Sequence, residues 1–262
     1  MKTTPHTTAN TRPRAWLRIL IVIGIFIAGV ALLFIGYFLW NATHSLPSNT
    51  QQLHAAQTNP AIQVSSNGSY YAIEPTATQA SSAVIIYPGA FAEPSAYIAR
   101  YAELAQKGIA VFIIRSPLHF ALLDVNRADR IMRENPHITH WYVAGHSLGG
   151  VAACDYAKSH QQKLSGLILL ASYCNGDATQ LGIPVVSISA SKDGLATPQK
   201  ILDSKNSLPA NTQFVVIEGG NHTLFGSFAK TQPGDNSAEI TEEHAQQQII
   251  TAISGFITLK LL

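Results

Sequence analysis

The residues best suited to chemistry form a glycine-rich motif around a serine. Residues 145–150 read Gly-His-Ser-Leu-Gly-Gly and come directly after the apolar run 141–144. This run predicts a strand and residues 148–158 predict a helix, so Ser147 is expected at the turn between them. Glycines on both sides of the serine permit the strained backbone of such a sharp turn. The pattern Gly-x-Ser-x-Gly in this setting predicts an exposed serine nucleophile.

Two later loops carry residues that could activate this serine. A serine hydroxyl is a weak nucleophile and requires a base that is itself oriented by an acid. The loop of residues 190–194 contains Asp193, and the loop of residues 218–222 ends at His222. Each loop follows a predicted strand, and the carboxyl ends of parallel strands meet at one edge of a sheet. The sequence therefore predicts Asp193 as the acid and His222 as the base.

Other titratable residues near these loops are weaker candidates. Asp177 follows the predicted strand 166–170 and is an alternative acid. Glu218 lies in the same loop as the predicted base and is expected to cap or support it. His146 and His119 are expected to pack or to form hydrogen bonds, and His119 is also a candidate for lining the pocket. No set of His, Asp and Glu has metal-ligand spacing, so neither a metal nor a cofactor is expected.

From about residue 69 to its end, the chain resembles the α/β-hydrolases, in particular the compact type similar to dienelactone hydrolase. The resemblance rests on four segments, which read Tyr-Pro-Gly-Ala at 87–90, Gly-His-Ser-Leu-Gly-Gly at 145–150, Ser-Lys-Asp-Gly at 191–194 and Gly-Gly-Asn-His at 219–222. It implies a catalytic triad in the chain order Ser147, Asp193, His222. Dienelactone hydrolases carry a cysteine nucleophile where this chain has a serine, so their particular activity is not implied.

The same resemblance implies an oxyanion hole formed by two backbone N–H groups. One belongs to Leu148, directly after the nucleophile. The other belongs to the loop after the predicted strand 83–87, where Ala90 is the expected donor and Phe91 the next candidate. Two such donors would stabilise the transition state by a few kcal/mol.

The substrate pocket is expected to be shallow and open. Only 14 residues separate the predicted strand ending at Leu170 from the one beginning at Val185, which leaves no room for the cap domain that many lipases carry there. The predicted pocket residues are Phe91, Tyr173, Leu195 and Phe225. An open pocket favours small or extended acyl groups over deeply enclosed ones.

The elements that position these residues alternate along the chain. Short β-branched runs are separated by longer helical stretches, which is typical of a mostly parallel sheet flanked by helices. The predicted strands are residues 70–74, 83–87, 110–114, 141–144, 166–170, 185–189 and 214–217. The predicted helices are residues 94–106, 118–134, 148–158 and 238–257. The expected fold class is therefore α/β, with an α/β-hydrolase fold that lacks a cap domain.

A long apolar segment precedes this domain. No Asp, Glu, Lys or Arg occurs between Arg18 and Glu74, and residues 19–40 would span roughly 33 Å as a helix, enough to cross a bilayer. The cations of residues 1–18 then place the N-terminus in the cytoplasm and the rest outside. A cleaved signal peptide is the alternative, but its apolar region is usually shorter. The predicted organisation is a cytoplasmic basic tail (1–18), a transmembrane signal anchor (19–40), a polar tether (41–68) and an α/β-hydrolase domain (69–262).

Composition excludes several classes of protein. With 262 residues, 12% charged residues and a formal net charge of +2, the chain is neither a disordered polyelectrolyte nor a strongly basic nucleic-acid binder. Its two cysteines, Cys154 and Cys174, are too few for a disulfide scaffold or a Cys-rich zinc module. They are expected to be unpaired, although an extracytoplasmic location would permit a disulfide.

Together these patterns predict a membrane-anchored, extracytoplasmic serine hydrolase of carboxylesterase-like activity. It would cleave an ester-like bond in a small-molecule or envelope-derived substrate through an acyl-enzyme, without a cofactor. An acyltransferase that acts on envelope lipid, glycan or peptide is an alternative that uses the same residues. The third hypothesis is a non-catalytic binding module on a hydrolase scaffold. No nucleic-acid partner is expected.

Overall fold

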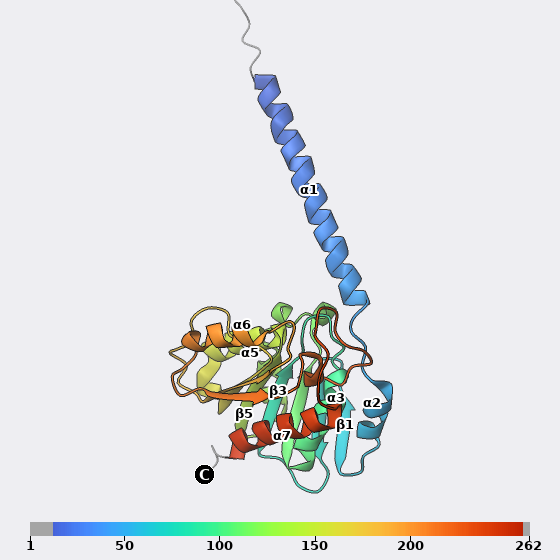
Figure 1. Ribbon diagram of the computed structural model, residues 1–262, viewed down its shortest axis with the longest axis vertical. Helices are drawn as coiled ribbons and strands as arrows, with labels where there is room; N and C mark the ends of the chain where they lie inside the picture. Colours follow the sequence, from blue (N-terminus) through green and yellow to red (C-terminus); the bar gives the residue numbers. More distant parts are fainter. Residues whose placement is uncertain (1–12, 259–262) are drawn as a thin grey trace, which may run out of the picture. The chain divides into compact units, whose positions relative to one another are not determined.

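The computed structural model of this protein describes residues 13–258 and divides into two compact units. Within the described residues, the first unit is α1 (Pro13–Thr43), a single uninterrupted helix (Figure 1). Its segment Trp16–Thr43 contains an unburied 18-residue window of mean hydropathy 3.0, so it is long and apolar enough to cross a membrane. The predicted span of residues 19–40 lies inside this helix. Most of the predicted basic tail lies outside the described residues.

The second unit begins at His44 and is built on one eight-stranded sheet. Its strands are β1 (Ile62–Ser66), β2 (Tyr70–Pro75), β3 (Ser82–Tyr87), β4 (Ile109–Ile114), β5 (His140–His146), β6 (Gly166–Leu170), β7 (Val185–Ala190) and β8 (Gln213–Ile217). They lie in the order β1-β2-β4-β3-β5-β6-β7-β8. The pairs β1–β2 and β2–β4 are antiparallel, and every pair from β4 to β8 is parallel. The predicted mostly parallel sheet is confirmed, and β1 is an additional edge strand.

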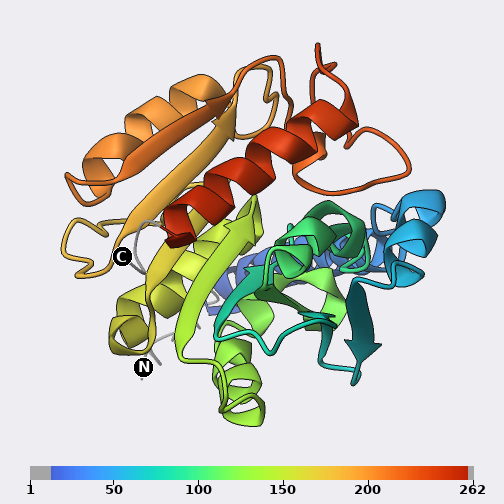
Figure 2. The ribbon, with the colours of Figure 1, turned by 90° about the horizontal axis from the view of Figure 1, so that it is seen from below.

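Helices cover both faces of this sheet. They are α2 (Thr50–Gln57), α3 (Ala96–Gln106), α4 (Arg127–Glu134), α5 (Leu148–His160), α6 (Pro198–Ser204) and α7 (Glu242–Thr258), with the short 3₁₀ turns η1 (Pro117–His119), η2 (Ala121–Leu123), η3 (Gln161–Lys163), η4 (Lys205–Ser207) and η5 (Thr223–Phe225). Val84 and Ile86 of β3 pack in one apolar cluster with α3 and α7, whereas Ala83 and Ile85 pack in another with α4 and α5. Figure 2 shows α7 (red) lying across the strands. Both faces of the central strands are buried, which fits their mostly apolar sequences.

The predicted helix over residues 118–134 is interrupted. Leu118 and His119 adopt φ angles of 55° and 52°, a left-handed conformation that a right-handed helix cannot contain. The chain therefore forms the two short turns η1 and η2, and only its last part forms α4. The strand-to-helix connection is a structured loop at the carboxyl end of β4.

The segment 41–68 is not the polar tether that its composition predicts, because it contains α2 and β1. The side chains of Leu46 and Ile62 are buried in the same apolar cluster as α3 and α7. Polar residues between them find partners in the domain, as Ser48 does when its N–H donates to the carboxylate of Glu93 (3.0 Å). A few widely spaced apolar residues anchor this segment, which explains why its sequence has no hydrophobic period.

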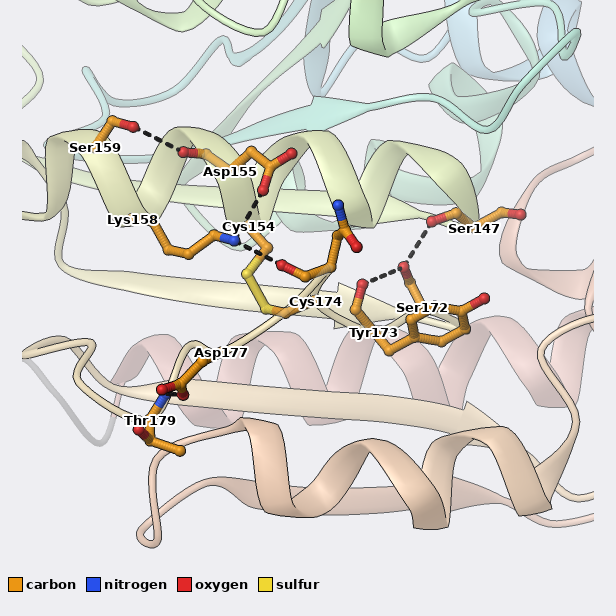
Figure 3. The surroundings of a disulfide bond; sticks show 11 residues. Ser147, Cys154, Asp155, Lys158, Ser159, Ser172, Tyr173, Cys174, Asp177 and Thr179 are labelled. Carbon is orange, nitrogen blue, oxygen red and sulfur yellow. Dashed lines mark hydrogen bonds and ion pairs between the residues drawn. A yellow bond between two sulfur atoms is a disulfide. The ribbon is translucent and has the colours of Figure 1, made fainter.

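Cys154 and Cys174 form a disulfide, contrary to the prediction that both are unpaired. Their Cα atoms are 5.5 Å apart, within the usual range for a disulfide. Cys154 is buried on α5, and Cys174 lies beyond β6 on a loop that turns back along this helix (Figure 3). The return path of that loop is set by the packing of the strand against the helix, so the cysteine spacing alone does not predict the bond.

Candidate active site

Ser147 lies at the sharp turn between β5 and α5, where the glycine-rich motif places it. Its φ and ψ angles are 53° and −128°, a conformation that non-glycine residues rarely adopt. Two backbone hydrogen bonds fix this turn: the Ser147 N–H donates to the carbonyl oxygen of Leu170 (3.0 Å), and the N–H of Gly150 donates to the Ser147 carbonyl oxygen (2.9 Å). The serine therefore leaves the strand and lines a cavity. Backbone strain of this kind clusters at functional sites.

The glycines of the motif are required by close packing around the serine. A Cβ atom at Gly149 would overlap the carbonyl oxygen of Tyr87 on β3, and one at Gly145 would overlap the carbonyl oxygen of Gly149. A Cβ atom at Gly150 would overlap the hydroxyl of Ser172. Helix α5 can start directly against the end of the sheet because these three positions have no side chain.

Asp193 and His222 form a buried hydrogen-bonded pair. They lie in the loops after β7 and β8, and they are 2% and 0% exposed. Asp193 Oδ2 lies 2.8 Å from His222 Nδ1. The other carboxylate oxygen, Oδ1, accepts the N–H groups of Leu195 (2.8 Å) and Ala196 (2.7 Å). A carboxylate held in this way accepts a hydrogen bond from Nδ1–H. It thereby fixes the orientation and the tautomer of the imidazole ring.

The second ring nitrogen of His222 is left without a partner. Nε2 is buried and has no hydrogen-bond partner among the described residues. Because Nδ1 carries the proton, Nε2 has a free lone pair and can accept another proton. The ring of His146, the residue before Ser147, lies 4.5 Å from the ring of His222, measured between centroids. The structure thus places Ser147, Asp193 and His222 beyond the carboxyl ends of three parallel strands, β5, β7 and β8, but Ser147 forms no hydrogen bond with His222 Nε2.

A second histidine, His146, is buried beside this pair. Burial and the neighbouring His222 lower the pKa of His146 well below its usual value. Its Nδ1 lies 2.8 Å from the hydroxyl of Tyr97, and the oxygen of that hydroxyl also accepts the N–H of Gly89 (2.9 Å). Burial raises the pKa of Tyr97, so the hydroxyl keeps its proton, and the tautomer of His146 decides which of the two groups donates in this hydrogen bond.

The candidate oxyanion donors differ in their availability. The N–H groups of Leu148 and Ala90 have no acceptor among the described residues. The N–H of Phe91 donates to the carbonyl oxygen of His119 (2.8 Å), so Phe91 cannot serve as the alternative donor. The N–H of Gly89 is also occupied, by Tyr97. Leu148 and Ala90 are therefore the two candidates that could bind an oxyanion.

A cavity of about 160 Å³ lies beside Ser147. Its lining residues are Ser147, Leu148, Val151, Ala171, Ser172, Tyr173, Leu195 and Ala196. They include Tyr173 and Leu195 but neither Phe91 nor Phe225, the other two residues predicted to line the pocket. Phe225 is 1% exposed, and its ring stacks on His146 at 5.8 Å between centroids, because η5 turns it into the core.

The wall of this cavity is tied to the serine turn at two points. The hydroxyl of Ser172 donates to the carbonyl oxygen of Ser147 (2.6 Å). Two residues later, Cys174 is bonded to Cys154 on α5. Figure 3 shows Tyr173 between these two attachments. The loop that lines one side of the cavity is therefore held by a hydrogen bond and by a covalent bond.

Two acidic residues considered in the sequence lie apart from the Asp193–His222 pair. Asp177 is exposed, and its carboxylate accepts the N–H of Thr179 (2.8 Å). It lies far from Ser147, beyond the disulfide (Figure 3). Glu218 is exposed and, among the described residues, forms no hydrogen bond that supports the loop of His222.

His119 does not line the cavity beside the serine. It lines a separate cavity of about 500 Å³, together with Glu93 and Arg115. Burial lowers the pKa of its ring. Its carbonyl oxygen accepts the N–H of Phe91, so the backbone of His119 is hydrogen-bonded to the loop that follows β3.

No sequence pattern predicts a role for Asp235, whose carboxylate supports this site. The carboxylate of Asp235 accepts backbone N–H groups from Gly194, His222 and Thr223. It occupies the supporting position that the sequence predicts for Glu218. Asp235 belongs to a Pro-Gly-Asp-Asn segment that reads as an ordinary turn. It lies 13 residues after His222, so no local pattern links the two.

Comparisons with known proteins place the chain in a family. No curated protein matches the sequence. Among solved structures, an alpha-beta serine hydrolase homologue from Coxiella burnetii is similar at 17% identity, with a TM-score of 0.47, over 63% of this chain and 90% of that chain. The family model described as the alpha/beta hydrolase family matches residues 83–248, which include Ser147, Asp193 and His222. The chain is therefore a member of the alpha/beta hydrolase family.

Proposed function

We propose that this chain is a serine hydrolase that cleaves a carboxylic ester through Ser147, His222 and Asp193. The observation that carries the proposal is the buried hydrogen bond of 2.8 Å between His222 Nδ1 and Asp193 Oδ2, in a domain whose Ser147 lies on a strained strand-to-helix turn at the carboxyl end of the same sheet. A histidine oriented by a buried carboxylate is the arrangement that activates a serine hydroxyl in unrelated hydrolases. Membership of the alpha/beta hydrolase family supports the same class of reaction.

In the proposed reaction, Ser147 Oγ attacks the carbonyl carbon of the ester while its proton passes to His222 Nε2. Asp193 stabilises the imidazolium, and the N–H groups of Leu148 and Ala90 bind the tetrahedral oxyanion. Collapse breaks the bond to the alcohol oxygen, which takes the proton from His222 and leaves an acyl-serine. Water then attacks the acyl carbon and gives a proton to His222. The second collapse releases the carboxylic acid and restores the serine hydroxyl.

The proposed substrates have a short acyl group. The cavity beside the serine has a volume of about 160 Å³, with apolar lining from Val151, Leu195 and Ala196. This volume is well below the roughly 300–1,000 Å³ of pockets for drug-sized ligands. Acetyl and butyryl groups should therefore be accommodated better than long acyl chains.

We also propose that α1 anchors the hydrolase domain outside the cytoplasm. The length and apolar character of α1 suit a membrane span, and the cations of residues 1–18 favour a cytoplasmic N-terminus. The disulfide between Cys154 and Cys174 suits an oxidising compartment. The ester would then be a small molecule or a component of the cell envelope.

The test uses the full-length protein in detergent, treated with a fluorophosphonate probe and then assayed with p-nitrophenyl esters of increasing acyl length. Labelling and turnover should both require Ser147, and the acetate and butyrate esters should be cleaved faster than the octanoate ester. Ser147→Ala should reduce turnover at least 10³-fold, as removal of an activated nucleophile does. Ser159→Ala is the matched control, because Ser159 is an exposed serine near the end of the same helix.

Turnover that survives in folded Ser147→Ala would refute the mechanism. No labelling of the folded wild-type protein would instead support a binding module on a hydrolase scaffold. Analysis of the products with an added acceptor alcohol separates hydrolysis from acyl transfer, since the same acyl-enzyme could serve both.

A further inference from the structure

A long loop connects the histidine of the proposed triad to the last helix. It runs from Gly226 to Thr241, between η5 and α7, and forms neither a helix nor a named strand. Its start is held by the buried Arg100, whose guanidinium donates to the Gly226 carbonyl oxygen (3.0 Å). Near its end, the N–H of Glu239 donates to the carbonyl oxygen of Gly219 (2.7 Å). The loop is therefore attached at both ends, with Asp235 between the two attachments.

The carboxylate of Asp235 accepts five hydrogen bonds. The donors are the N–H groups of Gly194 (3.0 Å), His222 (3.3 Å) and Asn236 (2.9 Å) to Oδ1, and the N–H (2.8 Å) and hydroxyl (2.6 Å) of Thr223 to Oδ2. These donors come from three different segments of the chain. One carboxylate thus joins the residue after Asp193 to the backbone of His222 itself.

These bonds continue the connection between β7 and β8 beyond the point where strand pairing stops. The pairing of the two strands ends at Ala190 and Ile217. The loop that carries Asp193 and the loop that carries His222 then extend past the sheet. Two further bonds join the early parts of these loops, from Lys192 N–H to the Gly220 carbonyl oxygen and from Gly219 N–H to the Ser191 hydroxyl, both 2.8 Å. Asp235 makes the corresponding connection at the far ends of the loops.

The loop of Asp235 also packs tightly against both of these loops. A Cβ atom at Gly194 would come within 2.8 Å of the Asn236 nitrogen and of the Gly234 carbonyl oxygen. The side-chain amide of Asn221, the residue before His222, donates to the Asn236 carbonyl oxygen (2.6 Å). The position of Asp235 is therefore defined by contacts on both sides of it.

We propose that Asp235 is a positioning residue that sets the distance and orientation of His222 relative to Asp193. The inference rests on the proposed function, in which these two residues act on Ser147. All five groups around the carboxylate donate, so the site requires an acceptor on both oxygens. An amide in its place has a single oxygen, so its NH₂ group would face donors at one of the two positions. A displacement of about 1 Å in an active site can lower the rate about 10²-fold, so the loss of this carboxylate should lower the rate of the chemical step.

The test compares Asp235→Asn with the wild-type full-length protein, using p-nitrophenyl acetate as the substrate. We expect kcat to fall about 10–100-fold, while KM stays within about twofold because Asp235 does not line the cavity. The rate of fluorophosphonate labelling should fall with kcat, since labelling also requires an activated serine. Asp177→Asn is the matched control, because that carboxylate also accepts a backbone N–H but lies far from the serine. Its kcat and KM should equal those of the wild type.

Asp235→Glu separates geometry from charge. It keeps the carboxylate but moves it by one methylene, and the proposal requires kcat to remain at least fivefold below the wild-type value. If Asp235→Asn does not fold, Thr223→Val removes the hydroxyl donor to Oδ2 and should lower kcat about threefold or more at unchanged KM.

Three results would overturn the inference. They are a folded Asp235→Asn enzyme with wild-type kcat, an Asp235→Glu enzyme whose kcat is less than fivefold below wild type, and a loss of kcat that Asp177→Asn reproduces. Each of them would leave the proposed function intact provided that Ser147→Ala is inactive. An active Ser147→Ala enzyme would instead refute the proposed function itself.

Discussion

The two halves of the proposed active site are held in place by different forces. The turn around Ser147 is fixed by contacts between backbones, which need glycine at 145 and 149, and by a disulfide that ties its neighbouring loop to α5. The half that contains His222 is fixed by two carboxylates, Asp193 and Asp235, which accept N–H bonds from several loops. The serine half is therefore held by close backbone packing and a disulfide, and the histidine half by hydrogen bonds to two carboxylates.

This difference predicts how each half responds to substitution. Backbone packing and a disulfide contribute mainly to the free energy of unfolding, so damage to the serine half should appear first as lost stability. The carboxylates orient a single imidazole ring, so damage to the histidine half should appear first as lost rate. Substitutions of similar size in the two halves should then have separable effects on melting temperature and on kcat.

Among substitutions in the histidine half, the largest effect on rate is expected from Asp193→Asn. The asparagine oxygen can still accept the N–H groups of Leu195 and Ala196, but its NH₂ group then faces His222 Nδ1. The ring must carry its proton on Nε2, where it cannot accept the proton of Ser147. We expect kcat for p-nitrophenyl acetate to fall about 10⁴-fold, while the circular dichroism spectrum stays native.

Asp203→Asn is the control for this substitution. Asp203 is an exposed carboxylate on α6 that accepts a hydrogen bond from Gln199 (2.7 Å), so its loss should leave kcat unchanged. A kcat within tenfold of the wild-type value in Asp193→Asn would assign the role of the acid to another residue and would remove the contrast between the two halves.

An intermediate effect, on stability rather than rate, is expected when the disulfide is removed. Cys154 and Cys174 are 20 residues apart in the sequence, and a cross-link closing a loop of this length contributes about 3 kcal/mol to the free energy of unfolding. Replacing both with alanine should lower the melting temperature by about 6–12 °C. Because Ser172 still donates to Ser147, kcat below the melting transition should stay within a few-fold of wild type.

A reductant provides the control for the disulfide. Dithiothreitol should lower the melting temperature of the wild-type protein towards that of the double-alanine variant and should leave the variant unchanged. Equal melting temperatures of the reduced and oxidised wild-type protein would show that the serine half does not depend on the covalent bond.

The difference between the two halves also explains which features the sequence predicts. The serine turn is recognisable because its requirements are local: a strand, a helix and glycines at fixed offsets from Ser147. The parallel strands are recognisable because each is a short apolar run buried on both faces. Asp193 and His222 follow from their places after two such strands.

Other features depend on contacts between distant segments and leave no local pattern. Gln52, in the segment expected to be a tether, donates to Glu242 on α7 (2.7 Å), a residue 190 positions away. The disulfide depends on how a loop returns along α5, and Phe225 is in the core rather than in the cavity because η5 turns inward. Asp235 shares a turn composition with many exposed loops, so only its partners distinguish it.

The smallest predicted effect concerns His146, which precedes Ser147 and touches the ring of His222, and so lies between the two halves. In the unfolded chain a histidine takes up a proton near pH 6.5, whereas burial lowers the pKa of His146 in the folded protein. Below about pH 6.5 the unfolded state therefore binds more protons, and the free energy of unfolding falls as the pH falls. The slope from this residue is up to about 1.4 kcal/mol per pH unit and vanishes above that pH.

His146→Gln removes this titration and keeps a side-chain oxygen that can accept the hydroxyl of Tyr97. We expect the melting temperature of the variant to depend less on pH between about 5 and 6.5 than that of the wild type, as measured by circular dichroism. His244→Gln, which replaces an exposed histidine on α7, should keep the wild-type dependence. If His146→Gln also keeps it, then folding does not lower the pKa of His146, and this prediction is wrong.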